Sequence, residues 1–145
     1  MEIRRGQRLA MRDLCQNADS FQIGLSISGL SGEIDFACFG LDTQQKLLDE
    51  RYMTFYNQTE SPCGGVKLIK PDQDSARFLC QLTTLPASID RLVFTAALNS
   101  SETMQQLQGG YLRFLVANQV VARFSFSGAD FLDEKALMVG EIYRK

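Results

Sequence analysis

The sequence predicts an all-β protein: an antiparallel β-sandwich of about eight strands with one to three short helical turns. Apolar and polar residues alternate with a period of two along much of the chain, as they do in strands that bury one face. Turn-forming residues separate these stretches every 8–12 residues or so, a spacing typical of sandwiches. The 145 residues contain neither an internal repeat nor a linker, so a single domain over residues 1–145 is expected.

The first two strands are predicted at residues 21–28 and 33–41. In the segment FQIGLSIS (21–28), the residues Phe, Ile, Leu and Ile alternate with Gln, Gly, Ser and Ser, the pattern of a half-buried strand. The segment GLSG that follows has the composition of a hairpin turn. It leads into EIDFACFGL, the second predicted strand.

Six further stretches have strand composition, and three have weak helical signals. The strands are predicted at residues 51–57, 77–85, 91–98, 111–117, 120–127 and 136–144. Helical turns are predicted within residues 85–91, within 101–107 with Ser101 as the N-cap, and within 130–137 with Asp130 as the cap.

The charge balance argues against a nucleic-acid partner. Fifteen basic residues stand against 17 acidic ones, for a net charge of −2, whereas neutralising phosphates requires a basic face. Four arginines near the N-terminus are interpreted as a solvated strand edge that resists pairing; they are Arg4, Arg5, Arg8 and Arg12.

The sequence carries no signal for a membrane or for export. No apolar run approaches the roughly 20 residues that span a bilayer. The N-terminal stretch is charged and lacks the apolar core of a signal peptide. A cytoplasmic location is therefore expected.

The cysteines predict reduced thiols and not a zinc site. Cys15, Cys38, Cys63 and Cys80 form no C-x-x-C pair, and the chain contains no histidine. Cys38 and Cys80 fall inside predicted strands, where a small buried thiol is the ordinary state. A cytoplasmic protein is expected to keep such thiols reduced.

No catalytic residue is predicted. Cys63 invites the hypothesis of a nucleophile, but a thiol nucleophile normally needs a base, and histidine is the usual one. Zero histidines exclude Cys–His and Ser–His machinery. Cys63, between a proline and two glycines, is interpreted as a turn residue, and a redox-sensitive thiol stays open as an alternative.

Two pairs of carboxylates are the remaining chemical candidates. Glu33 and Asp35 are two residues apart on a predicted strand, so both side chains are expected on one face. Asp72 and Asp74 are two apart in a loop, an arrangement that suits calcium. The loop lacks the glycine and the final glutamate of an EF-hand, and a solvated polar loop is the preferred interpretation.

Six segments, taken in order, resemble the TerD family, the tellurite-resistance and stress-response proteins of bacteria. They are RRGQR, IGLSIS, IDFACFGLD, FYNQTESPCGG, LPASIDRLVF and ALMVGEIYR, and together they cover essentially the whole chain. The resemblance implies a β-sandwich that binds calcium through acidic loops. It also implies a further strand after the last segment, so this chain represents either a shorter branch or one domain cut from a longer protein. Without that strand, 136–144 is expected to be an exposed edge.

The calcium loop is where this chain departs from the family pattern. Family members follow Ser-Pro with a long, acidic, glycine-rich stretch, whereas this chain has the short, half-basic CGGVKLIKPDQDSARF. The remnant candidate ligands are Glu33, Asp35, Asn57, Asp72 and Asp74, and Asn57 matches the family's asparagine. Lys67 and Lys70 stand beside the remnant loop and repel a cation, and fewer carboxylates weaken binding. No metal or other cofactor is therefore expected, with calcium as the alternative.

The expected function follows from the resemblance and from the missing catalytic set. The chain is predicted to be a divergent TerD member, closer to the TerA branch, that acts as a non-enzymatic interaction module. Its expected partners are other proteins of a tellurite- or stress-resistance complex, including a membrane-associated one. The alternatives are a calcium-binding sensor and an enzyme, either carboxylate-based or thiol-redox through Cys63.

Overall fold

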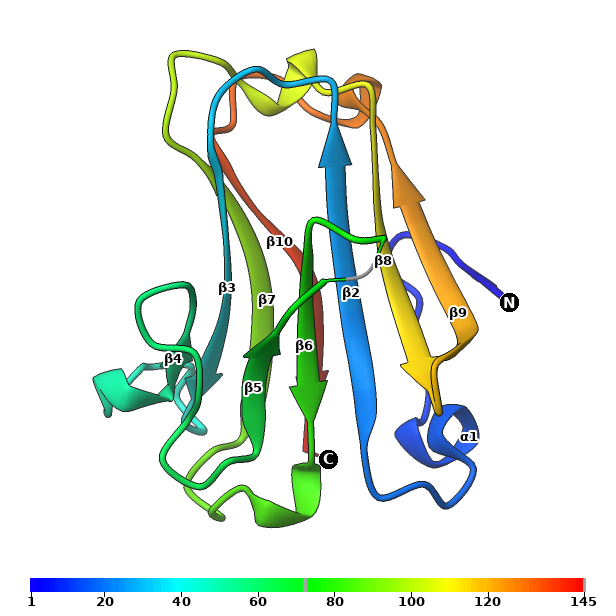
Figure 1. The fold of residues 1–145 in the computed structure, drawn as a ribbon, viewed down its shortest axis with the longest axis vertical. Coiled ribbons are helices and arrows are strands. Elements are labelled where there is room, and N and C mark those ends of the chain that lie inside the picture. The colour runs from blue at the N-terminus through cyan, green and yellow to red at the C-terminus, as the bar shows by residue number, and fades with distance from the viewer. Residues whose placement is uncertain (72, 145) are drawn as a thin grey trace.

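The computed structural model describes residues 1–71 and 73–144, and it confirms the predicted all-β sandwich. Over these residues two sheets face each other, and in the view of Figure 1 β5 lies in front of β7 and β6 in front of β10. The six-stranded sheet runs in the order β1 (Glu2–Ile3), β9 (Gln119–Phe126), β8 (Gly109–Val116), β2 (Phe21–Ser28), β6 (Ala76–Cys80), β5 (Val66–Ile69). The four-stranded sheet runs in the order β10 (Ala136–Tyr143), β7 (Arg91–Leu98), β3 (Ile34–Leu41), β4 (Met53–Thr54).

Neighbouring strands are antiparallel except for one pair, β1 and β9, which run parallel. This pair joins the N-terminal residues to the edge of the six-stranded sheet, where Figure 1 places the N-terminus beside β9. Among the described residues, β10 forms an edge of the four-stranded sheet, as predicted for residues 136–144.

The core lies between the sheets and consists of the residues that alternation assigned to it. Phe78 of β6 and Phe94 of β7 are fully buried and meet edge to face across the core, with ring centroids 5.5 Å apart. Phe21 and Phe114, on adjacent strands, stack at 4.7 Å. Burying these rings removes large apolar areas from water, which is the main stabilising contribution to such a sandwich.

Two of the eight-residue strands were predicted to the residue. β2 and β7 coincide with the predicted strands 21–28 and 91–98. Two predicted strands are wrong in extent because 3-10 turns replace part of each. η1 (Glu50–Tyr52) precedes the two-residue β4, and Asp49 caps it by accepting the Arg51 backbone N–H. η2 (Leu82–Thr84) follows β6, and the Thr84 hydroxyl donates to the Gln81 carbonyl.

The three helical turns predicted from sequence are only partly correct. The turn within 101–107 is η3 (Met104–Gln106), and Thr103, not Ser101, forms its capping box. The prediction within 130–137 is wrong, because η4 (Gly128–Asp130) comes earlier and is capped by Ser127, while Ala136 already begins β10. Within 85–91 there is only a turn, closed by the Ile89 N–H and the Pro86 carbonyl.

Three short elements were not predicted: β1, β5 and α1 (Met11–Cys15). β5 pairs with β6 and so lies where the sequence indicated a polar loop. Among the described residues, no helix has both the length and the apolar character needed to cross a membrane.

Candidate functional site

The candidate ligands on β3 lie at the outer face of the four-stranded sheet. Cys38 is in the core, so alternation along β3 turns Asp35 outward. The Asp35 carboxylate accepts a hydrogen bond from the Asn99 side-chain amide. Glu33 is exposed just before the strand, and its carbonyl accepts the Asn99 backbone N–H at 3.2 Å.

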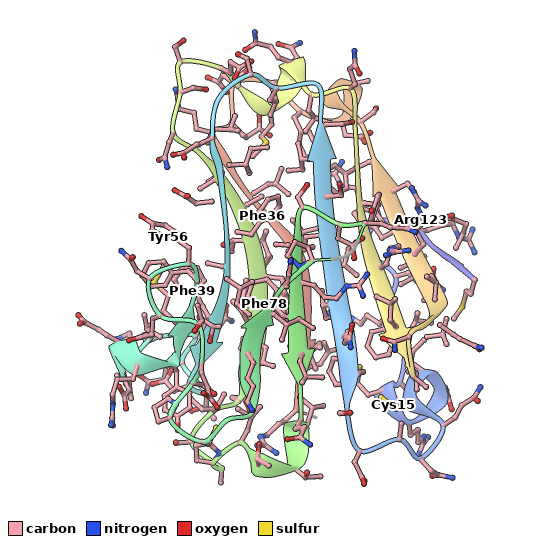
Figure 2. All side chains as sticks on the ribbon, viewed as in Figure 1. Cys15, Phe36, Phe39, Tyr56, Phe78 and Arg123 are labelled. Atoms are coloured by element: carbon pink, nitrogen blue, oxygen red, sulfur yellow. The ribbon has the colours of Figure 1, made fainter. Side chains whose placement is uncertain are left out.

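Asn57 is exposed at the tip of a tight turn, next to Tyr56. The turn is closed by two backbone hydrogen bonds between Phe55 and Gln58, at 2.9 and 3.0 Å. Figure 2 shows Tyr56 beside β4, at the side of the molecule away from Arg123. The candidate Asp72 lies outside the described residues.

Asp74 is on the opposite side of the sandwich, where its carboxylate is fully enclosed by cationic and phenolic donors. The side chain has 0% exposed surface. One oxygen accepts from the Tyr111 hydroxyl at 2.7 Å and from Arg113 Nε at 3.0 Å. The other accepts from Arg77 Nε and Nη2 at 3.0 and 2.7 Å, and from Arg113 Nη2 at 3.0 Å. Such charge-assisted bonds are the strongest in a protein.

Gly24 makes room for this carboxylate. Gly24 lies between Ile23 and Leu25, which face the core, so its missing side chain would point outward from β2. A Cβ at this position would lie 2.4 Å from Asp74 Oδ2. The register places Arg77 of β6 and Arg113 of β8 directly opposite Gly24 on either side. The carboxylate therefore sits over the glycine, between two arginines.

A third arginine extends the row across the sheet. Arg123 of β9 is the direct cross-strand partner of Arg113, and its guanidinium carbon lies 4.3 Å from the centroid of the Tyr111 ring. Like charges directly opposite each other are unfavourable in a sheet. Here Asp74 supplies a negative charge beside Arg113, and Glu2 is the register partner of Arg123 on β1.

The surroundings keep Asp74 ionised. Burial opposes its ionisation, but the hydrogen bonds from Arg113, Tyr111 and Arg77 outweigh that effect and hold the pKa of the carboxyl below its usual value. Burial raises the pKa of Tyr111, and its hydrogen bond to Asp74 adds to the effect. Asp74 is thus a structural anion whose two oxygens are already in use.

The fold therefore does not gather the four described candidate ligands, Glu33, Asp35, Asn57 and Asp74, into one site. Asp35 and Asp74 belong to the outer faces of different sheets, and Asn57 lies in a turn at the β4 edge. Within residues 1–71 and 73–144, no three His, Cys, Asp or Glu side chains come close enough to hold a metal ion.

Cys63 lies in a turn that begins at Ser61. The Gly64 N–H donates to the Ser61 carbonyl at 2.9 Å, and the Gly65 N–H donates to the Cys63 sulfur at 3.3 Å. The Ser61 hydroxyl is 3.5 Å from the same sulfur. Burial raises the pKa of the Tyr52 hydroxyl, and the neighbouring Cys63 thiol adds to that shift.

Cys38 and Cys80 are buried free thiols, as the sequence predicted. Their exposed fractions are 1% and 0%. Burial raises the pKa of both thiols well above the usual value, and the Cys80 thiol adds to the shift of Cys38. A thiol held protonated in this way is a poor nucleophile.

Sequence reasoning missed the residues around Asp74: Arg77, Tyr111, Arg113 and Arg123. One signal for them was available. Gly24 interrupts the outward-facing side of an otherwise regular strand, and such a glycine often marks a close approach by another group. The identity of that group depends on the strand order, which the sequence alone did not show.

Comparison with known proteins identifies the family. The model of the TerD domain matches residues 1–145. The uncharacterized protein YceE of Bacillus subtilis is 24% identical over 163 residues, covering 99% of this chain and 84% of that protein. General stress protein 16U of the same organism is 27% identical over 124 residues, covering 77% of this chain and 64% of that protein, which is less than two thirds of its length.

Two crystal structures show the same fold. A Streptomyces coelicolor homologue of a telluride resistance protein (TerD) superposes with a TM-score of 0.67 at 12% identity, over 88% of this chain and 82% of that one. A protein of unknown function superposes with a TM-score of 0.64 at 16% identity, over 88% and 81%. With the family model matching from the first residue to the last, this chain belongs to the TerD domain family.

Proposed function

We propose that this chain is a non-enzymatic interaction module of a bacterial tellurite-resistance or stress-response system, located in the cytoplasm, whose calcium binding is weak or lost. Membership of the TerD family supports the resistance or stress role, as does the likeness to general stress protein 16U. The proposed partners are other proteins of a resistance complex, including a membrane-associated one. The closeness to the TerA branch remains a prediction.

The observation that carries the calcium part of the proposal is the state of Asp74. Calcium binds six to eight oxygen ligands, so each carboxylate of a site must offer free lone pairs. Both Asp74 oxygens already accept from Arg77, Arg113 and Tyr111. A calcium ion at Asp74 would have to displace two guanidinium groups and then remain beside their positive charges, which is costly.

Calcium titration of the unfolding temperature tests this part. We expect the melting temperature in millimolar calcium to stay within about 1 °C of its value in chelator, with magnesium as the matched control. A site with micromolar affinity would instead stabilise the fold by about 4 kcal/mol at a thousandfold excess over Kd, a rise of many degrees. Such a rise would support the alternative, a calcium sensor.

The enzymatic alternative rests on Cys63, and the Cys63→Ser variant tests it. The sulfur lies in a turn and accepts the Gly65 N–H. We expect the variant to restore tellurite or stress tolerance in a deletion strain as well as the unsubstituted protein does. Loss of tolerance, with the variant still folded and present at normal abundance, would favour thiol chemistry.

Co-purification from the native host tests the interaction part. We expect the same partner proteins to be recovered in calcium and in chelator, because the proposed binding does not depend on the ion. Recovery only in calcium would contradict the proposal. Recovery of no partner in either condition would contradict the interaction module itself.

A further inference from the structure

The free edge of β10 borders a groove on the open side of the sandwich. The six-stranded sheet extends beyond the four-stranded one, because β10 packs over β8: a Cβ on Gly140 would lie 2.7 Å from Leu112 Cδ1. The inner face of β9 therefore continues past the last strand opposite it. The groove in this region has a volume of about 1040 Å³.

The groove has an apolar floor and two different walls. Phe124 of β9, which is half-buried, forms part of the floor. One wall is β10, which contributes Leu137 and Ile142. The other is the N-terminal segment 3–11, which runs from β1 to α1 close to β9 in Figure 1.

The shape and backbone chemistry of this groove suit an extended strand. In the described residues β10 pairs with β7 alone, so one edge of an eight-residue strand is without a neighbouring strand. Such an edge is a template for main-chain hydrogen bonding, and adding a strand to it is a common way of binding a peptide. Alternate side chains of an added strand would point down onto the apolar floor.

The charge of the N-terminal wall decides what the remaining side chains of such a strand should be. Arg4, Arg5 and Arg8 line the groove and are exposed. Asp130 and Glu141 also line it, but Asp130 accepts the Ser127 N–H and Glu141 bonds to Arg91. A basic rim beside an apolar floor fits a strand in which apolar residues alternate with acidic ones.

The same charges argue against a second copy of this chain as the occupant. A two-fold dimer through β10 would be isologous, so each protomer would present the same surface to the other. That arrangement would bring two basic N-terminal segments to one interface, with like-charge repulsion between them.

We propose that this groove binds an extended segment of a partner protein, with bulky apolar residues alternating with Asp or Glu, as an added strand on β10. The inference rests on the proposed role as an interaction module and names its binding surface. The apolar residues of the segment cover the floor at Phe124. Its acidic residues pair with Arg4, Arg5 and Arg8, and its backbone pairs with the free edge of β10.

Labelled peptides provide the direct test, using the full chain. The probe is a ten-residue peptide in which glutamate alternates with valine, and binding is measured by fluorescence anisotropy. One control alternates lysine with valine, and another keeps the probe's composition but places the valines in one block. We expect only the probe to bind, to weaken as salt rises, and to slow amide exchange within residues 136–143.

Charge-reversal variants localise the site. Arg4→Glu, Arg5→Glu and Arg8→Glu together should weaken binding of the probe by roughly tenfold, as three exposed ion pairs are lost. The matched control reverses Lys46, Lys67 and Lys70, which lie toward the β4 and β5 edges, and should bind as the unsubstituted protein does. Thermal unfolding checks that both variants fold. The amide-exchange measurement uses the unsubstituted protein, so its result does not depend on either variant.

Four results of the peptide experiments would overturn the inference. They are no binding of the probe, equal binding of the lysine peptide, slowed exchange at a region other than β10, and dimerisation through β10 that the probe does not displace. Binding to anionic lipid vesicles without binding to the probe would also overturn the inference, and it would indicate that the groove binds a membrane surface. If co-purified partners are unchanged in the arginine triple variant, the groove inference fails while the proposed function stands.

Discussion

Asp74 accepts hydrogen bonds from three side chains, so its loss would remove a negative charge that two nearly buried guanidinium groups share. Only 9% of the Arg77 side chain and 14% of the Arg113 side chain are exposed. We expect Asp74→Asn to lower the free energy of unfolding by about 2–4 kcal/mol. Urea denaturation measures this, and the exposed pair Asp49–Arg51 supplies the control, since Asp49→Asn should cost less than about 1 kcal/mol.

The Asp74 carboxylate should also affect how the free energy of unfolding changes with pH under acidic conditions. Its pKa in the folded protein is lowered, so its contribution is fully present above the unfolded-state pKa of about 3.9 and is lost as pH falls through the lower folded value. The free energy of unfolding of the unsubstituted protein should therefore fall more steeply below about pH 4 than that of Asp74→Asn. Parallel curves between pH 2 and 6 would count against an ionised Asp74 in the folded state.

The destabilisation caused by a substitution at Gly24 should depend mainly on the presence of Asp74, and less on the position of Gly24 within a strand. The Cβ of Gly24→Ala would lie 2.4 Å from Asp74 Oδ2, so we expect a loss of about 1–3 kcal/mol in urea denaturation. In an Asp74→Ala background the obstacle is gone, and the same substitution should cost much less. A double-mutant cycle measures the difference, and a coupling energy near zero would refute the contact.

At the scale of elements, alternation over eight residues was enough to predict β2 to the residue, and strand composition was enough to predict β7. β1 has two residues and β5 has four, too few for a period of two to stand out from the neighbouring charged residues. The Asp74 cluster was not predictable for a different reason. Arg77 and Arg113 meet at Asp74 only because β6 and β8 both pair with β2, and that order is a property of the folded sheet.

The turn between β2 and β3 is held by a carboxylate from another loop. Glu102 accepts the backbone N–H groups of Ser31, at 3.1 Å, and Gly32, at 2.7 Å, and the Ser100 hydroxyl at 3.1 Å. The hydrogen bonds from Ser31 and Gly32 lower the pKa of Glu102. The tether is therefore present above the usual glutamate pKa of about 4.3 and is lost as pH falls through the lower folded value.

Glu102→Ala should loosen this turn without unfolding the sheets. We expect the Ser31 and Gly32 amides to exchange with solvent faster, because their acceptor is gone, while amides in β2 and β3 keep their protection. Amide exchange followed by NMR measures each position separately. Glu134→Ala is the matched control: Glu134 accepts the Leu132 N–H at 2.7 Å, so only that other turn should respond. Unchanged exchange at Ser31 and Gly32 would refute the tether.

At the scale of the whole molecule, the two sheets differ in width, and the N-terminal segment lies over the side that this difference leaves open. Ile3 and Leu9 pack against the core from this segment. The Arg123 N–H donates to the Met1 carbonyl at 2.9 Å, which continues the β1–β9 pairing to the first residue. The segment thus closes part of the sandwich and, in the inference above, also forms the basic wall of the groove.

Deleting residues 1–9 separates these two roles. We expect the free energy of unfolding to fall by about 1–3 kcal/mol, because the apolar contacts of Ile3 and Leu9 and the pairing along β9 are lost. The inner face of β9 would become more accessible, so binding of the dye ANS and self-association should both increase. Calorimetry, dye fluorescence and sedimentation measure the three effects.

The control replaces Arg4, Arg5 and Arg8 by serine, which removes the charge but keeps the apolar contacts. It should retain stability and low dye binding while losing affinity for acidic peptides. A deletion variant as stable and as monomeric as the full chain would show that the segment is not part of the packed sandwich.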